Sequence, residues 1–134
     1  MEVFVYSRAA VEALPPHDVP HVVVSITSYV DDRARIAAGE HCREILRLTF
    51  RDVLIGDGVF TANDAQKIWD ALGRNADVTR VVVHCDAGIS RSAAVAAAIL
   101  RAAGDDDAEI FRRHRPNPHV YETMLAFAPT PISA

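Results

Sequence analysis

The sequence predicts a three-layer α/β/α domain with a four-stranded, mainly parallel sheet between helices. Short apolar runs rich in valine alternate with stretches of helical periodicity. Continuous β-branched runs such as 22–24 and 81–83 are typical of strands that are buried on both faces, as in a parallel sheet. The 134 residues can bury one core, and no linker or repeat divides them, so we predict a single domain over residues 1–134.

Four apolar runs give the predicted strands, which cover residues 3–6, 21–26, 45–50 and 81–83. The third run alternates between apolar and polar residues, which is the period of a strand. A proline-rich connection over residues 15–20 separates the first helix from the second strand.

Helices are expected between and after these strands, and capping residues set their limits. The predicted N-caps are Ser7, Thr61, Asp105 and Asn117, and the predicted helix ends are Gly39, Gly73 and Gly104. A helix over residues 31–38 is part of this prediction. The stripe of Ala65, Ile68, Trp69 and Leu72 gives the third helix a buried face.

The stretch between the fourth strand and the next helix carries the chemistry. It runs His84-Cys85-Asp86-Ala87-Gly88-Ile89-Ser90-Arg91-Ser92. A tight strand-to-helix loop points backbone N–H groups and the positive end of a helix at one place, which forms an anion cradle. Here the cradle holds a cysteine, and its donors favour the nucleophilic thiolate over the thiol.

Other residues of the loop suit a phosphate. The planar guanidinium of Arg91 matches two phosphate oxygens at once. Gly88 permits a positive φ or a close backbone approach, and the Ser92 hydroxyl can stabilise the sulfur as a leaving group. The residues expected to bind the phosphate are Asp86, Ala87, Gly88, Ile89, Ser90 and Arg91.

The pattern His-Cys-x-x-Gly-x-x-Arg-Ser resembles the signature loop of the cysteine-dependent protein tyrosine phosphatase superfamily, and its wording is most similar to the dual-specificity branch. The resemblance covers residues 45–125 well and the first two strands by topology. It implies the strand order 1-4-2-3 and phosphomonoester hydrolysis through a cysteinyl-phosphate intermediate, with no metal or other cofactor. It also implies that His84 orients the loop through its ring hydrogen bonds.

This chemistry needs an acid, because an alkoxide or phenoxide leaves poorly unless it is protonated. In the resembling family an Asp in a loop after a strand, upstream of the cysteine, has this role. Asp52 follows the third predicted strand and stands 33 residues before Cys85, whereas Asp57 lies five residues later between two glycines. We favour Asp52 because the end of a strand is the more rigid base, and Asp57 is the alternative.

Two further residues are left open. By similarity to the Arg-Pro and Pro-Asn segment of dual-specificity phosphatases, either Asn117 or His119 is expected to brace the loop. Cys42 is interpreted as a packing residue, and the alternative is a resolving thiol that forms a disulfide with oxidised Cys85.

Composition limits the partners. The formal net charge of −4 provides no basic excess for nucleic acid or an anionic membrane, and Asp86 weighs against a highly charged lipid headgroup. The six histidines show no metal-ligand spacing. We expect a phosphorylated protein or a small phosphomonoester as substrate, and phosphate, sulfate or vanadate as ligands of the loop.

The same composition bears on location. Two cysteines are too few for a disulfide scaffold, and the first residues show no pattern of a signal peptide. With no apolar run long enough for a bilayer, and a thiolate that needs a reducing compartment, we expect a cytoplasmic protein.

Rival functions share these residues. A rhodanese-like sulfurtransferase or an arsenate reductase also uses a cysteine loop, usually without the upstream acid. A non-catalytic phospho-binding module would more naturally have lost Cys85 or Arg91. A deep pocket above Cys85 would favour phosphotyrosine, and a shallow one would favour phosphoserine, phosphothreonine or a small metabolite.

Overall fold

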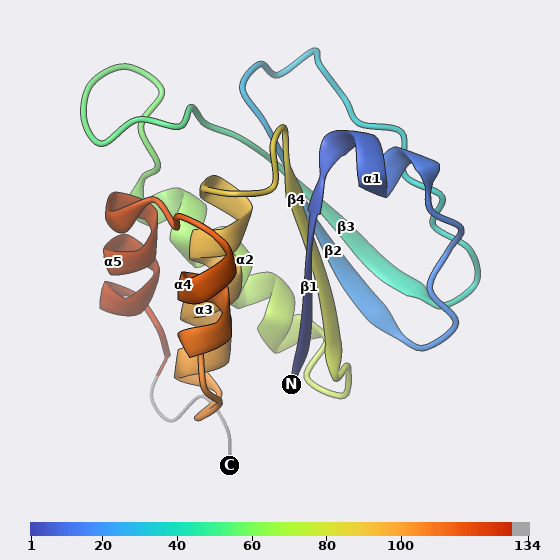
Figure 1. Ribbon diagram of the computed structural model, residues 1–134. Helices are drawn as coiled ribbons and strands as arrows, with labels where there is room; N and C mark the ends of the chain where they lie inside the picture. The colour runs from blue at the N-terminus through green and yellow to red at the C-terminus, as the bar shows by residue number, and fades with distance from the viewer. Residues whose placement is uncertain (130–134) are drawn as a thin grey trace.

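The computed structural model describes residues 1–129 and shows one parallel sheet. Its strands are β1 (Glu2–Ser7), β2 (His21–Thr27), β3 (Cys42–Thr49) and β4 (Arg80–Cys85). They lie in the order β1-β4-β2-β3, and every neighbouring pair is parallel (Figure 1). The predicted fold class and strand order are both confirmed. Their carboxyl ends therefore meet at one edge of the sheet, where β4 runs into the cysteine loop.

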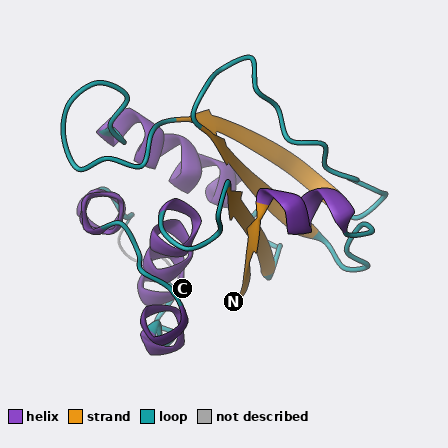
Figure 2. Ribbon diagram, turned by 45° about the horizontal axis from the view of Figure 1, so that its top comes forward, coloured by secondary structure: helices purple, strands orange, loops and turns teal. Residues whose placement is uncertain are grey.

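Helices cover both faces of this sheet, as expected. The bounds are α1 (Arg8–Ala13), α2 (Ala62–Arg74), α3 (Arg91–Ala102), α4 (Ala108–Arg113) and α5 (Pro118–Ala126). Figures 1 and 2 show α1 on one face and the other helices on the opposite face, where α3 packs against β1 and β4. None of the helices within residues 1–129 is long and apolar enough to cross a membrane.

Alternating side chains of the strands supply the two halves of the core. In β4, Val81 and Val83 face α2, α3 and α5, whereas Val82 faces α1. Both sets are almost fully buried, which explains why the run contains no polar residue. The apolar face of α5 packs into the larger half, where the indole of Trp69 donates a hydrogen bond to the carbonyl of Met124 at 2.9 Å.

The alanine-rich helix α3 is buried along most of its length, from Arg91 to Ile99. Small side chains let this helix lie close to β1 and β4 on one side and to α5 on the other. The helix that begins in the cysteine loop is therefore fixed by packing on several sides.

Residues 31–38 do not form the predicted helix. They form an irregular segment, called the strap below, because side chains of neighbouring elements bind the backbone carbonyls of this segment. Arg8 donates to the carbonyl of Arg33 at 3.0 Å, and Arg47 donates to the carbonyl of Ala34 at 3.1 Å. Tertiary hydrogen bonds to the strap thus replace the ladder that a helix would form.

Helix ends agree with the prediction at most positions. The N-caps at Ser7, Thr61 and Asn117 are confirmed, and each accepts a backbone N–H through its side chain. The prediction was wrong at Gly73, because α2 continues past it to a cap at Asn75. It was also wrong at Asp105: Asp107 is the N-cap of α4, and the Asp105 carboxylate accepts a hydrogen bond from the N-terminal amine at 3.2 Å.

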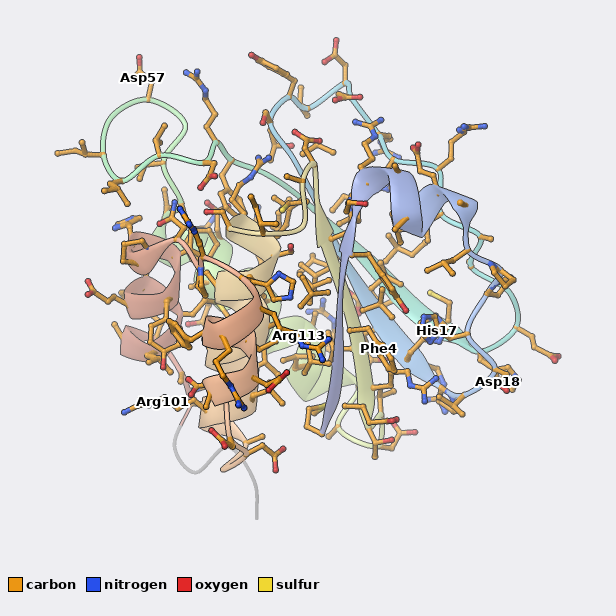
Figure 3. All side chains as sticks on the ribbon, viewed as in Figure 1. Phe4, His17, Asp18, Asp57, Arg101 and Arg113 are labelled. Atoms are coloured by element: carbon orange, nitrogen blue, oxygen red, sulfur yellow. The ribbon has the colours of Figure 1, made fainter. Side chains whose placement is uncertain are left out.

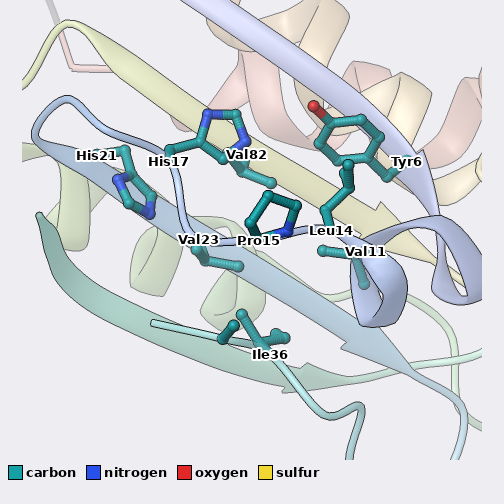
Figure 4. A pocket seen from close by; sticks show the side chains of 10 residues that line it. Tyr6, Val11, Leu14, Pro15, His17, His21, Val23, Ile36 and Val82 are labelled. Atoms are coloured by element: carbon teal, nitrogen blue, oxygen red, sulfur yellow. The ribbon is translucent and has the colours of Figure 1, made fainter. Parts of the chain in front are cut away.

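A small cavity lies beneath α1 (Figure 4). Side chains of the strands and of the connection after α1 enclose it, among them Tyr6, His17, His21 and Val82. Its volume of about 20 Å³ holds about one water-sized group, so it is a gap in packing and offers no room for a substrate.

Candidate active site

Cys85 is the last residue of β4, and its side chain is only 2% exposed. Its sulfur accepts a hydrogen bond from the Gly88 N–H at 3.2 Å and lies 3.1 Å from the hydroxyl oxygen of Ser92. Ser92 is fully buried in the first turn of α3. A backbone N–H of the loop and a hydroxyl of the helix therefore both lie within hydrogen-bond distance of the sulfur.

The loop turns at Gly88, where φ is +74°. A Cβ atom on this residue would lie 2.6 Å from the backbone nitrogen of Ser7 and 2.7 Å from the carbonyl carbon of Tyr6. Beside this contact, the Arg8 N–H donates to the carbonyl of Asp86 at 3.0 Å. Gly88 thus provides both a positive φ and a close approach, and the approach is to the end of β1.

Several N–H groups of the loop have no hydrogen-bond acceptor in the described part of the chain. Those of Ala87, Ile89, Ser90 and Arg91 have no backbone acceptor within residues 1–129. The N-cap residue Ser90 makes no side-chain capping bond either. Free N–H groups at the start of a helix of this length form a positive site that is suited to an anion.

Arg91, the first residue of α3, is only 5% exposed. Its Nη1 donates to the carbonyl of Phe50 at 2.8 Å and to the Ser28 hydroxyl at 3.0 Å, while Nη2 donates to the Asp86 carboxylate at 3.1 Å. Its Nε is buried and has no partner in the described part of the chain. The guanidinium is therefore held inward by three segments, and its Nε–H is left without a partner in the described part of the chain.

Asp52 lies beside the loop. Its Oδ1 accepts hydrogen bonds from the Ser90 hydroxyl and from the Asn117 amide, each at 2.9 Å. Asp57 is exposed at the outer part of the loop that follows β3, and its side chain points away from the fold (Figure 3). The structure thus brings Asp52, and not Asp57, to the cysteine loop.

Asn117 also separates the two candidates for bracing. Its side-chain amide bridges Asp52 and the Val53 carbonyl, and its backbone N–H donates to the carbonyl of Ser90 at 3.1 Å. The His119 ring instead donates to the Phe60 carbonyl at 2.8 Å. Asn117 is the residue that contacts the cysteine loop.

His84 is fully buried behind the nucleophile. Burial lowers the pKa of His84 below its ordinary value, and the hydrogen bond to the Cys85 carbonyl opposes this effect only in part. In the neutral ring, Nδ1 donates to that carbonyl at 3.3 Å, so Nε2 accepts from the Ser25 hydroxyl at 2.6 Å. The ring thus links β4 to β2 directly below the loop.

Cys42 is the first residue of β3, so it lies at the amino ends of the strands, whereas Cys85 lies at the carboxyl end of β4. Cys42 pairs with His21, which is level with Arg80 at the start of β4. Cys85 lies at the other end of β4, roughly 16 Å from Arg80 along the strand at 3.3 Å per residue. A disulfide needs Cα atoms within about 7 Å, so the two thiols cannot pair in this fold, and burial raises the pKa of Cys42.

Several contacts of this site were not predicted from the sequence, among them the Ser28 hydroxyl and the Phe50 carbonyl on Arg91, and the Ser90 hydroxyl on Asp52. Ser28 and Phe50 follow β2 and β3 directly, so their position after a parallel strand was the available signal. Across residues 1–129, no cluster of three His, Cys, Asp or Glu side chains could hold a metal ion.

Comparison with known proteins supports this fold. No family model and no curated protein matches the sequence. Among solved structures, human DUSP28 has 20% sequence identity and a TM-score of 0.63, with 93% of this chain and 90% of that chain covered. PTPMT1 in complex with PI(5)P has 26% identity and a TM-score of 0.54, covering 81% and 76%. The human tyrosine phosphatase-like serine/threonine/tyrosine-interacting protein has 19% identity and a TM-score of 0.56, covering 81% and 76%. The chain therefore has the dual-specificity-phosphatase-like fold of the cysteine-dependent tyrosine phosphatases.

Substituting Gly88 by Ala should lower the free energy of unfolding by more than about 1 kcal/mol, because the added methyl meets the β1 backbone at an unfavourable φ. Urea denaturation measures this change. Gly73→Ala is the matched control: a Cβ there meets nothing within 4 Å, and alanine favours a helix, so stability should be kept or raised. Equal effects of the two substitutions would contradict the close approach at Gly88.

The buried neutral His84 should make stability fall as the pH falls. Its pKa is lowered in the folded state, so below the ordinary histidine pKa the unfolded chain binds more protons and is favoured. The wild type should therefore lose stability on acidification from about pH 8 to about pH 5.

Urea denaturation of His84→Gln over the same pH range should show a smaller loss. A shallower dependence is also expected for His17→Gln, because burial lowers the pKa of His17 in the same direction. An unchanged slope in His84→Gln would show that a neutral ring at this position does not contribute.

Proposed function

We propose that this chain, which has the fold of the cysteine-dependent tyrosine phosphatases, hydrolyses phosphomonoesters through a cysteinyl-phosphate intermediate. One observation carries the proposal: the Cys85 sulfur sits among converging donors, with the buried Arg91 guanidinium fixed against the same loop. Such a site favours a thiolate and binds a phosphate next to it.

In the first step the Cys85 thiolate attacks phosphorus, and the bond from phosphorus to the ester oxygen breaks. The free loop N–H groups and the unpartnered Nε of Arg91 hold the equatorial oxygens, whose negative charge they stabilise. Asp52 donates its proton to the leaving oxygen, so an alcohol or phenol departs.

The arrangement of Asp52 suits this role. Both of its hydrogen bonds, from Ser90 and Asn117, end on Oδ1. The carbonyl oxygen of a carboxylic acid is a better acceptor than its hydroxyl oxygen, so two donors on Oδ1 favour the acid proton on Oδ2. The two contacts thus orient the carboxyl group while its second oxygen remains available to the substrate.

In the second step Asp52 takes a proton from water, which attacks phosphorus and breaks the bond to sulfur. Inorganic phosphate leaves, and the thiolate is restored. The Ser92 hydroxyl and the Gly88 N–H donate to the sulfur and stabilise it as the leaving group. Asp52 ends this step protonated, ready for the next substrate.

The substrate class we favour is a phosphorylated protein, with a small phosphomonoester as the alternative. Asp86 places a carboxylate on Arg91 and reduces the positive charge that a phosphoinositide headgroup would require, although the solved PTPMT1 structure holds PI(5)P. Exposed apolar side chains stand on the cysteine loop and after Asp52, at Ile89, Leu54 and Ile55. Such side chains suit contact with a protein surface. A catalytic thiolate also agrees with a cytoplasmic location.

The rival functions remain distinguishable by experiment. A sulfurtransferase or an arsenate reductase would not depend on Asp52, and a phospho-binding module would release no phosphate. One structural neighbour is named both phosphatase-like and interacting, which keeps the second rival relevant.

Replacing Cys85 by Ser should abolish release of phosphate from p-nitrophenyl phosphate, with a loss on the order of 10⁴-fold or more, because the sulfur is the nucleophile. A colorimetric assay of p-nitrophenol measures this rate. Cys42→Ser is the control and should keep the wild-type rate, since Cys42 lies at the far edge of the sheet. Phosphate release by Cys85→Ser at the wild-type rate, or none by the wild type, would overturn the proposal.

Replacing Asp52 by Asn should slow hydrolysis of an alkyl phosphate by roughly 10²- to 10⁴-fold, because that leaving group needs a proton. For an activated aryl phosphate, whose leaving group needs no proton, the rate of the first step should fall much less. The matched variant Asp57→Asn should behave as the wild type, since Asp57 points away from the site. Equal rates for Asp52→Asn and the wild type on the alkyl ester would favour a rival function.

A further inference from the structure

A polar pocket lies at the carboxyl ends of β2 and β3, apart from the cysteine loop. Its volume is about 110 Å³, and Ser25, Thr27, Arg33, Arg47 and Thr49 contribute to its lining. By strand alternation these residues of β2 and β3 share the face of the sheet that α1 covers, while the larger core lies on the other face.

Two guanidinium groups in this pocket form no ion pair within residues 1–129, those of Arg33 and Arg47. The Asp32 carboxylate also lines the pocket, but it is paired with Arg8 at 2.7 Å. Arg47 is partly buried on β3 and uses one N–H for the Ala34 carbonyl. Burial, and after it the positive charge of Arg33, lower the pKa of Arg47. Two like charges that face one partly enclosed space are unfavourable unless an anion joins them.

The hydroxyl groups of the pocket divide into committed and free donors. The Ser25 hydroxyl hydrogen goes to His84, and the Thr27 hydroxyl donates to the carbonyl of Tyr29 at 3.2 Å. Thr49 makes no side-chain hydrogen bond within the described residues, so its hydroxyl can donate. The pocket therefore presents two guanidinium groups and one free hydroxyl as donors, and its one carboxylate, that of Asp32, is already paired with Arg8.

We propose that this pocket is an anion site for a phosphate group, distinct from the Cys85 cradle. Guanidinium groups bind phosphate oxygens in pairs, and a hydroxyl can serve a third oxygen. The site shares no side chain with the cradle.

The position of the pocket allows two sources for the phosphate. Ser25 pairs with Arg47 on one side and with His84 on the other, so Arg47 lies two strands, or roughly 10 Å, from the residue before the nucleophile. A substrate with two phosphate groups could place one in the cradle and the other in this pocket, and free inorganic phosphate could also bind in the pocket. The first source rests on the proposed function, whereas the anion site itself does not.

Nuclear magnetic resonance with inorganic phosphate tests the site directly. In the wild type, the backbone amides of Arg33, Arg47 and Thr49 should shift on titration, and those of Gly88 and Ser90 should report the cradle separately. The double variant Arg33→Gln/Arg47→Gln should weaken the pocket response by about tenfold or more and leave the cradle response unchanged.

Arg43→Gln is the matched control, because Arg43 stands at the other end of β3 and is paired with Asp77 at 2.9 Å. It should keep both responses. If the pocket amides stay still while the cradle saturates in the wild type, the anion site is wrong. The single variant Arg33→Gln, at an exposed position, decides the same point should the double variant not fold.

Steady-state hydrolysis then identifies the source. The probes are a peptide with one phosphotyrosine and the same peptide with a second phosphate three residues away, roughly 10 Å in an extended chain. A preference of about tenfold in kcat/KM for the doubly phosphorylated peptide, lost in the double variant, assigns the site to the substrate. No preference, together with a persistent amide response, assigns it to free phosphate. If neither peptide is hydrolysed, the proposed function fails while the amide titration still decides the anion site.

Discussion

Gly88 approaches the end of β1 so closely that no side chain fits between them. This contact sets the curvature of the loop after β4: it directs the Gly88 N–H at the Cys85 sulfur and leaves the following N–H groups free. The first strand of the chain thus shapes a loop that lies about eighty residues later in the sequence. The packing of α3 against β1 and β4 holds the other end of that loop in place.

Polar side chains connect the loops at this edge of the sheet into one unit. Arg91 reaches the segments that follow β2 and β3, and Asp52 receives donors from the cysteine loop and from the cap of α5. Each charged group is thus held in a fixed orientation within the folded chain. Donors that are already oriented need no reorganisation when an anion arrives, which is the main source of stabilisation in sites of this kind.

The two faces of the sheet differ in their polarity at the same edge. One face carries Cys85 above a large apolar core, whereas the other carries His84, Ser25 and Arg47 beneath the strap of residues 31–38. The strap is also the clearest failure of prediction from sequence. Its residues favour a helix locally, but Arg8 and Arg47 bind its carbonyls more effectively than a short isolated helix could.

The sequence by itself determined the sheet, its buried faces and the identity of the cysteine loop, because valine runs, capping residues and the Cys85-to-Arg91 spacing are local patterns. Only the tertiary structure decided that Asp52 and Asn117, rather than Asp57 and His119, contact the cysteine loop, and it separated Cys42 from Cys85. It also placed the guanidinium groups of Arg33 and Arg47, which form no ion pair among residues 1–129, in one pocket. These outcomes depend on which segments meet at an edge of the sheet, and strand order and hydrogen bonds between distant loops set those meetings.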